Sequence, residues 1–343
     1  MSKRIAFIVV TLLVSMNTYG AYFNTNRLQK IVGPFLTEVG HIEEVKAFSN
    51  AFGVAPKTAS DITQYLDANT YKMLPVITIS SLLFDKETGM YRNDPDAIIN
   101  AIEKSKIHPD EMLFLMDEPL AAVRGACEKG KSKACRDVDD RYVETLSTLR
   151  LVGQLLRKQF PGSGVIHIEA WIELVQQKKQ YPNENVIMLD DAEYLGFDCY
   201  GNFDYCGSSE LGYNSQLTYG EWVWDAMHAL EATHSIGRKM FLVTGAFLAD
   251  QSFDSAEAIQ EQMYTYAYIL SQHDKLGGLG IFLWSDLVEN GKLFTGARGI
   301  PAIVDFIFLI AQYFGVGDRT EQCEVCVDFN GVVQSYGAQS FIK

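Results

Sequence analysis

The chain has 343 residues, of which 48% are hydrophobic and 21% charged, and it contains 27 glycines and 9 prolines. This composition is typical of a folded globular protein and excludes a disordered or collagen-like chain. The 43 Asp and Glu residues outnumber the 29 Lys and Arg residues, so the net charge is −14 and a phosphate backbone would be repelled. We therefore expect no nucleic-acid partner, whereas a neutral or cationic polymer is compatible with the charge.

The first twenty residues have the pattern of a secretory signal peptide. Lys3 and Arg4 precede an apolar run from Ile5 to Val14, and small or polar residues follow up to Gly20. The apolar run is about half of the roughly 20 residues that a membrane-spanning helix needs. We predict a signal peptide at residues 1–20, cleavage after Gly20 and a secreted or periplasmic protein that has no stable membrane insertion after cleavage.

Six cysteines agree with export, because an even number in an exported chain indicates disulfides. The pairs closest in sequence are Cys127 with Cys135, Cys199 with Cys206, and Cys323 with Cys326. Other connectivities are open, and a redox role for the last pair is an alternative. That pair lies in a polar C-terminal segment rather than between a strand and a helix, so a structural bridge is favoured.

Short β-rich apolar runs then alternate with longer amphipathic stretches, which is the pattern of parallel strands covered by helices. Eight strands are predicted, at Ile31–Leu36, Gly53–Pro56, Met73–Ile79, Met112–Asp117, Gly164–Glu169, Tyr194–Cys199, Lys239–Thr244 and Leu279–Trp284. Helices are predicted at Asp94–Lys106, Val138–Phe160, Tyr219–Ile236, Ser255–His273 and Pro301–Phe314. Eight such units without a linker predict an α/β fold, a (β/α)8 TIM barrel over residues 21–320 with disulfide-stapled βα loops and a C-terminal tail at 321–343.

The alternative architecture is a doubly wound open sheet, which normally carries a glycine-rich phosphate-binding turn after an early strand. The sequence has no G-x-G-x-x-G or P-loop signature, and the run Gly277-Gly278-Leu279-Gly280 precedes a strand rather than opening a helix. The barrel is therefore favoured, and we expect no cofactor.

A barrel of this kind places its active site at the C-terminal ends of its strands. The fourth predicted strand is apolar until it ends in Asp117-Glu118-Pro119, where strand stability requires no carboxylate. The residues at or just after the ends of the fifth, sixth and eighth strands are His167, Glu169 and Trp171, then Asp198 and Tyr200, then Trp284 and Asp286. The strand ends together predict an acidic and aromatic rim.

Carboxylates beside aromatic rings suit the hydrolysis of glycosidic bonds. One protonated acid donates to the leaving oxygen, and a second negative or nucleophilic group supports an oxocarbenium-like centre. Glu118 follows Phe114 and Met116, and an apolar environment of this kind raises the pKa of a carboxyl group. We predict that Glu118 is a general acid. The alternative is a structural role, in which these carboxylates cap a helix or pair with an arginine.

Asp117-Glu118-Pro119 resembles the Asn-Glu-Pro motif of the clan A barrel glycoside hydrolases, and the resemblance implies that Glu118 is the acid/base. The seventh predicted strand lacks the glutamate that those enzymes use as nucleophile, and Glu169 is the nearest substitute. This reading predicts a double-displacement β-glycanase that uses Glu118 and Glu169. The missing carboxylate also keeps open a third hypothesis, a non-catalytic barrel that binds glycan.

The Asp-Glu pair also resembles that of substrate-assisted N-acetylhexosaminidases, barrels in which the acetamido group of the sugar is itself the nucleophile. In those families the Asp orients the acetamido group, the Glu is the acid, and a Tyr and a Trp line the pocket. The resemblance implies these roles for Asp117, Glu118, Tyr200 and Trp284. It favours a secreted glycoside hydrolase acting on an aminosugar-containing polysaccharide such as peptidoglycan, chitin or an exopolysaccharide.

The remaining residues of the rim suggest substrate contacts rather than a metal site. Tryptophan rings make good sugar platforms, so Trp284 is predicted as the floor of the site, with Trp171, His167, Asp198 and Asp286 as further substrate contacts. His167 and Glu169 share a strand face, but zinc needs at least three protein ligands and no clear third is present, so we expect no metal. The sequence does not indicate the oligomeric state.

Overall fold

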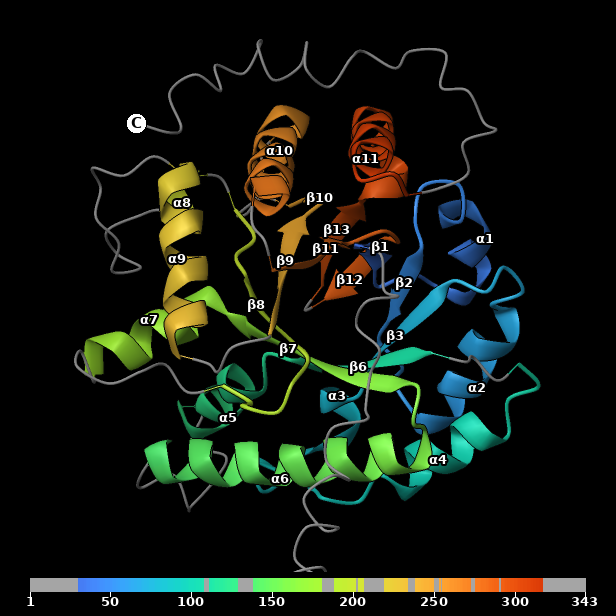
Figure 1. The fold of residues 1–343 in the computed structure, drawn as a ribbon, viewed down its shortest axis with the longest axis vertical. Helices are drawn as coiled ribbons and strands as arrows, with labels where there is room; N and C mark the ends of the chain where they lie inside the picture. Colours follow the sequence, from blue (N-terminus) through green and yellow to red (C-terminus); the bar gives the residue numbers. More distant parts are fainter. Residues whose placement is uncertain are drawn as a thin grey trace, which may run out of the picture.

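A computed structural model of the chain describes residues 30–107, 111–128, 138–180, 188–201, 203–206, 219–233, 238–249, 253, 255–272, 275–289 and 291–316. In this part of the chain, eight parallel strands form one sheet in the order β1-β11-β9-β8-β7-β6-β3-β2 (Figure 1). Their bounds are β1 Ile31–Phe35, β2 Ala51–Val54, β3 Leu74–Thr78, β6 Met112–Asp117, β7 Ser163–Ala170, β8 Tyr194–Asp198, β9 Lys239–Gly245 and β11 Leu276–Phe282. The predicted signal peptide and C-terminal tail lie outside the described residues.

The first and second strands, β1 and β2, meet and nearly close the sheet into a barrel. The Thr37 N–H donates to the Gly53 carbonyl at 3.0 Å, and the Asn50 N–H donates to the Val32 carbonyl at 3.2 Å. The Asn50 side chain in turn accepts the Val32 N–H at 2.9 Å. The predicted (β/α)8 architecture is confirmed.

Helices lie around the outside of the ring of strands (Figure 1). Their bounds are η1 Val39–His41, α1 Ile42–Val45, α2 Ala59–Ala68, α3 Ser80–Leu83, α4 Asp96–Glu103, α5 Pro119–Glu128, α6 Val138–Gln159, α7 Trp171–Gln180, α8 Phe203–Cys206, α9 Tyr219–Thr233, α10 Ala256–Gln272, η3 Ala297–Gly299 and α11 Pro301–Tyr313. Among the helices described, none has the length and apolar character that a membrane crossing requires.

Five further short strands lie in the loops that follow individual barrel strands, and they form two small antiparallel sheets. They are β4 Phe84–Asp85, β5 Met90–Tyr91, β10 Phe247–Leu248, β12 Leu287–Glu289 and β13 Lys292–Gly296. β4 and β5 form a hairpin after α3, whereas β10, β13 and β12 form a three-stranded sheet from the segments that follow β9 and β11. Both sheets therefore come from loops at the C-terminal ends of the strands, the end where a barrel carries its site.

Side chains alternate between the barrel interior and the helix layer along each strand, because successive residues point to opposite faces. The interior contains Ile31, Phe35, Ala51, Val76, Leu113, Leu115, Ile166, Ile168, Tyr194, Phe241 and Val243. Their neighbours in sequence pack against the helices. The alternation places Asp117 and Asp198 on the interior faces of β6 and β8, and it places His167 and Glu169 on the outward face of β7.

Two strands are shifted relative to their predicted bounds. β2 ends at Val54 rather than Pro56, and it pairs with β3 from residue 51 onward; a proline lacks the N–H that a ladder needs. β11 begins at Leu276 rather than Leu279 and includes two glycines that the sequence placed before the strand. A Cβ atom at Gly278 would lie 2.5 Å from the Ile31 carbonyl oxygen, so the glycine allows β1 and β11 to pack closely.

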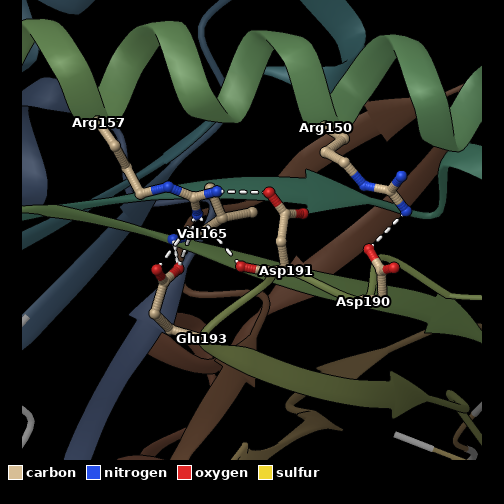
Figure 2. A network of polar contacts seen from close by, with 6 residues as sticks. All are labelled: Arg150, Arg157, Val165, Asp190, Asp191 and Glu193. Carbon is tan, nitrogen blue, oxygen red and sulfur yellow. Dashed lines mark hydrogen bonds and ion pairs between the residues drawn. The ribbon is translucent and has the colours of Figure 1, made fainter. Parts of the chain in front are cut away.

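Ion pairs fasten the long helix α6 to the segment that enters β8 (Figure 2). Arg157 contacts the Asp191 carboxylate at 2.6 Å and the Glu193 carboxylate at 3.1 Å. Arg150, about two turns earlier in the helix, pairs with Asp190. These contacts lie at the N-terminal end of β8, so they hold the helix layer in place and are remote from the strand ends that carry the site.

Candidate active site

β6 ends in two carboxylates that leave the strand in different directions. Asp117 follows the alternation into the barrel mouth, where it is exposed to solvent. At Glu118 the backbone has a φ of 43°, so the chain turns through the left-handed region before α5 begins at Pro119. This conformation costs a residue with a Cβ atom roughly 1–2 kcal/mol, so the surrounding contacts must hold it.

A third carboxyl group, Asp198 at the end of β8, meets this pair. Its side chain hydrogen-bonds that of Glu118, and it accepts the Tyr200 hydroxyl at 2.7 Å. Asp198 is only 3% exposed. Since β7 alone separates β6 from β8, the Glu118–Asp198 contact passes over the C-terminal end of β7. We call Asp117, Glu118 and Asp198 the carboxyl cluster.

The carboxyl cluster retains protons above the pH at which carboxyl groups ordinarily lose them. Burial, and then the negative charges of Glu118 and Glu169, raise the pKa of Asp117 to about 8; water reaches this side chain from the mouth, but protein surrounds it on its other sides. Burial and the charges of Glu118 and Asp117 also raise the pKa of Asp198 well above its ordinary value. Carboxyl groups packed this closely cannot all ionise together, and a retained proton is what a general acid requires.

Aromatic rings from several loops form a wall beside the cluster. The Tyr200 ring stacks on Phe282 with 4.6 Å between centroids. Phe247 packs edge-on against both rings at 5.7 Å, and Phe294 of β13 packs against Phe247 at 5.7 Å. An aromatic rim was predicted, and these four rings build an aromatic wall whose members, apart from Tyr200, were not identified from the sequence.

The predicted disulfide between Cys199 and Cys206 is present and closes the loop after β8, next to Tyr200. Cys127 at the end of α5 is also disulfide-bonded. Its predicted partner, Cys135, lies outside the described residues. Cys323 and Cys326 lie outside them too, so these two pairings stay predictions.

A buried glutamine joins this loop to the neighbouring strand. Gln262 of α10 is fully buried, and its Nε2 donates to the carbonyls of Cys199 and Gly201, both at 2.9 Å. Its Oε1 accepts the Thr244 hydroxyl at 3.0 Å and the Gly245 N–H at 2.8 Å. One amide therefore fixes the main chain on both sides of Tyr200 relative to the end of β9.

We expect Gln262→Leu to lower the free energy of unfolding by about 3 kcal/mol, because several buried main-chain groups lose their partner at about 1–3 kcal/mol each. Urea denaturation measures the change. Gln272→Leu, at an exposed position of the same helix, is the control and should change stability by less than about 0.5 kcal/mol. Equal stabilities of the two variants would contradict the assigned role of Gln262.

Glu169 and His167 lie behind the mouth, in the layer between β7 and the helices. Both are fully buried. The Glu169 carboxylate accepts the N–H groups of Leu120 and Ala121, at 3.0 and 3.2 Å. Burial raises the pKa of Glu169 to about 8 and lowers that of His167 to about 3, so the imidazole is neutral. Main-chain donors thus occupy both oxygens of the carboxylate that was considered as a nucleophile.

The two rim tryptophans are buried in the helix layer instead of lying open at the mouth. Trp171 is 7% exposed and packs on Trp222 with 5.1 Å between centroids. Trp284 is 3% exposed and packs 5.1 Å from Phe48, so it offers no open face for a sugar. Asp286 is exposed, but it accepts a main-chain N–H of β13 at 2.9 Å. The structure therefore does not gather these three residues around the carboxyl cluster.

Two residues near the cluster were missed by the sequence analysis. The Ser80 hydroxyl accepts the Asp117 N–H at 3.0 Å and donates to the Asp117 carbonyl at 3.1 Å. Tyr91 is buried, and its pKa is raised well above the ordinary value by burial and by the charges of Glu169, Asp117 and Glu118. A glycine-containing loop between two short β-rich runs is the signal that identifies the β4–β5 hairpin carrying Tyr91.

The chemistry that these residues offer is proton transfer between carboxyl groups. The described part of the chain contains no group of three or more His, Cys, Asp or Glu side chains arranged to hold a metal ion. Asp198 bonds to Glu118 and to the Tyr200 hydroxyl, while Asp117 adds a carboxyl open to the mouth. The cluster can therefore supply an acid, its conjugate base and a hydrogen-bond acceptor at one place.

No protein family and no curated protein matches the sequence. Among solved structures, the chain is similar to a β-glucuronidase of Bacteroides uniformis, with a TM-score of 0.41 and 12% identity over 70% of this chain. It is also similar to a GH113 β-1,4-mannanase (TM-score 0.40, 10% identity, 82% of this chain and 98% of that chain) and to xylanase 10B of Thermotoga maritima (0.43, 8%, 83% and 97%). The chain spans 27% of the glucuronidase. The reaction therefore has to be inferred from the geometry of the site.

Proposed function

We propose that the protein is a secreted glycoside hydrolase that cleaves glycosidic bonds in an aminosugar-containing polysaccharide such as peptidoglycan, chitin or an exopolysaccharide. The observation that carries this proposal is the hydrogen bond between Glu118 and Asp198 at the ends of β6 and β8, beside a third carboxyl group at Asp117. Glycoside hydrolysis needs a protonated acid and a second negative group within one site. The three partly exposed rings of the aromatic wall, Tyr200, Phe282 and Phe294, add apolar surface of the kind on which sugar rings pack.

Glu118 is the general acid in this proposal. Its side chain is partly exposed, so it can touch a substrate, whereas Asp198 behind it is buried and bonded to it. The raised pKa of Asp198 keeps a proton available to the pair at neutral pH. When the glycosidic C–O bond breaks, Glu118 gives its proton to the leaving oxygen and becomes a carboxylate. That carboxylate then serves as the base that takes a proton from the attacking water.

The nucleophile in the proposed mechanism is the acetamido oxygen of the sugar, which forms a bond to the anomeric carbon as the leaving group departs. Asp117 is open to the mouth and is placed to accept the acetamido N–H, while Tyr200 holds Asp198. Water then opens the cyclic intermediate, and the configuration is retained. The burial of Glu169 and the engagement of both its oxygens favour this mechanism over double displacement with Glu169 as nucleophile.

We also propose that the protein acts outside the cytoplasm. The N-terminal sequence has the pattern of a signal peptide. The Cys199–Cys206 disulfide supports export, because structural disulfides persist in oxidising compartments.

Release of reducing ends from a panel of polymers tests the proposed activity. The panel contains peptidoglycan, chitin, deacetylated chitin, poly-N-acetylglucosamine and cellulose, each incubated with the mature protein with and without a thiazoline mimic of the cyclised sugar. We expect an N-acetylated polymer to be cut and the thiazoline to inhibit. Cutting of cellulose that is insensitive to the thiazoline would favour double displacement. Binding of a glycan with no cutting of any polymer would favour a non-catalytic barrel and overturn the proposal.

Replacing Tyr200 by Phe should move the basic limb of the pH–rate profile upward by roughly one pH unit. The Tyr200 hydroxyl donates to Asp198 and lowers the pKa of that carboxyl. Without it the pKa of Asp198 rises further, so the cluster keeps its proton to higher pH; a hydrogen bond to a charged group of about 1.5 kcal/mol corresponds to about one pKa unit. Profiles of kcat/KM from about pH 5 to about pH 10 measure the shift. Tyr205→Phe, an exposed tyrosine of the same loop, is the control, and a downward shift in Tyr200→Phe would contradict the prediction.

A further inference from the structure

A buried carboxylate lies directly behind the turn that carries Glu118. Glu169 projects from the outward face of β7, and its two oxygens accept the N–H groups of Leu120 and Ala121. These are the second and third residues of α5, which begins at Pro119. N–H groups at the start of a helix have no partner within the helix, and a carboxylate there is favoured by the helix dipole. Glu169 therefore caps α5 from the neighbouring strand.

The chain is bonded on each side of Glu118 as well. Ser80 holds the main chain of Asp117, and the Glu118 N–H donates to the Ile168 carbonyl at 2.8 Å. Glu169, the residue after Ile168, then holds the first turn of α5. Two consecutive residues of β7 thus fix the main chain at and just after Glu118. These contacts explain how a glutamate stays in the left-handed region, where few residues other than glycine are found.

A neutral histidine fixes the carboxylate in turn. The Leu189 N–H donates to Nδ1 of His167 at 3.0 Å, so the ring proton is on Nε2, which faces the Glu169 carboxylate at 3.4 Å. The Ala170 N–H donates to the same carboxylate at 3.2 Å. The three main-chain N–H groups and the His167 ring N–H all donate to Glu169. A side chain with two acceptor oxygens is needed to accept all four. The charge of Glu173, on α7, also raises the pKa of Glu169. Glu173 itself forms an ion pair with Arg124.

We propose that Glu169 is a positioning residue, which holds the turn after β6 so that the Glu118 carboxyl group meets Asp198. The catalytic consequence of this arrangement rests on the function proposed above, whereas the positional effect does not. Glu169 acts through the main chain of α5 and touches no substrate. Loss of its contacts lets the turn relax toward an ordinary conformation and withdraws Glu118 from Asp198.

The titration of Asp198 reports the position of Glu118, because Glu118 raises its pKa both by charge and by the hydrogen bond. The full chain labelled with ¹³C at the carboxyl carbons of Asp and Glu allows this titration to be followed by NMR, with the Asp198 signal assigned by its loss in Asp198→Asn. We expect the apparent pKa of Asp198 to fall by more than half a unit in both Glu169→Gln and Glu169→Asp. The aspartate keeps a carboxyl group but is too short to reach α5, so it separates an effect of position from an effect of the chemical group.

Glu173→Gln is the matched control, since Glu173 is a buried carboxylate that holds α5 through Arg124 without touching the turn. It should leave the Asp198 titration unchanged. Ala121→Pro removes one of the capped N–H groups at a helix position that tolerates proline, so it covers the case in which the Glu169 variants do not fold. It should shift the Asp198 titration in the same direction. An unchanged Asp198 titration in a folded Glu169 or Ala121 variant, or an equal shift in Glu173→Gln, would overturn the proposal.

Kinetics on whichever polymer is cut supply the second readout. Glu169→Asp should lower kcat by about tenfold and leave KM within about twofold, because the acid is misplaced while the substrate-binding surface is kept. A rise in KM with unchanged kcat would show that Glu169 serves binding and would overturn the positioning role. If no polymer is cut, the proposed function fails, and the titration still decides whether Glu169 positions Glu118.

Discussion

Glu118→Gln should lower kcat by at least ~10²-fold in the polymer assay of the proposed function, because removal of a general acid typically costs 10²–10⁴-fold. The amide keeps the shape of the side chain and a hydrogen bond to Asp198, but it has no proton to give to the leaving oxygen. The thermal midpoint should stay close to that of the unchanged protein, since Glu118 is partly exposed and its main-chain bonds are kept. Reducing-end release by the two proteins measures the effect.

The leaving group provides a sharper test of this role. An aryl glycoside with an acidic phenol leaves without protonation, so Glu118→Gln should lose much less activity on that substrate than on the polymer. Glu257→Gln, an exposed glutamate in the first turn of α10, is the control and should keep full activity on both. Equal losses on the two substrates would show that Glu118 is not the general acid.

Arg124→Met should lower the free energy of unfolding by about 3–5 kcal/mol, the range for breaking one side of a buried ion pair. Arg124 binds the Glu173 carboxylate through two nitrogens, at 2.7 and 3.1 Å. Glu173 is 2% exposed, and the Tyr142 hydroxyl also donates to it. Without Arg124 the carboxylate stays buried with no cation beside it. Urea denaturation monitored by tryptophan fluorescence gives the change.

An exposed ion pair of the same geometry is the natural comparison for Arg124. Arg298 binds Glu44 through two nitrogens at 2.9 and 3.0 Å, but both side chains are about two-fifths exposed. Arg298→Met should cost no more than about 1 kcal/mol. Arg124→Met combined with Glu173→Met should recover part of the lost stability, because it removes the unpaired charge as well. A loss in Arg124→Met as small as that in Arg298→Met would contradict the prediction.

Local pattern was enough to predict the barrel, most of its strands and the residues at their ends. The apolar runs and turn signals that define Met112–Asp117 and Tyr194–Asp198 are properties of a few consecutive residues, and both strands occur as predicted to within a residue. The spacing of Cys199 and Cys206 similarly predicted a disulfide that is present. The carboxyl cluster draws entirely on residues chosen in this way, at the ends of two strands.

Packing in three dimensions decided which of those residues face the site. Each barrel strand is buried on both faces, so apolar residues occur at both sets of alternate positions and the sequence does not reveal which set points inward. A change of face separates Asp198, inside the mouth, from Glu169, which lies in the helix layer and accepts main-chain N–H groups. The same packing buried the rings of Trp171 and Trp284 against other side chains and built the aromatic wall from loops that are distant in sequence. Side-chain direction and loop contacts depend on the nearly closed barrel, whereas the ends of β6 and β8 follow from the local chain.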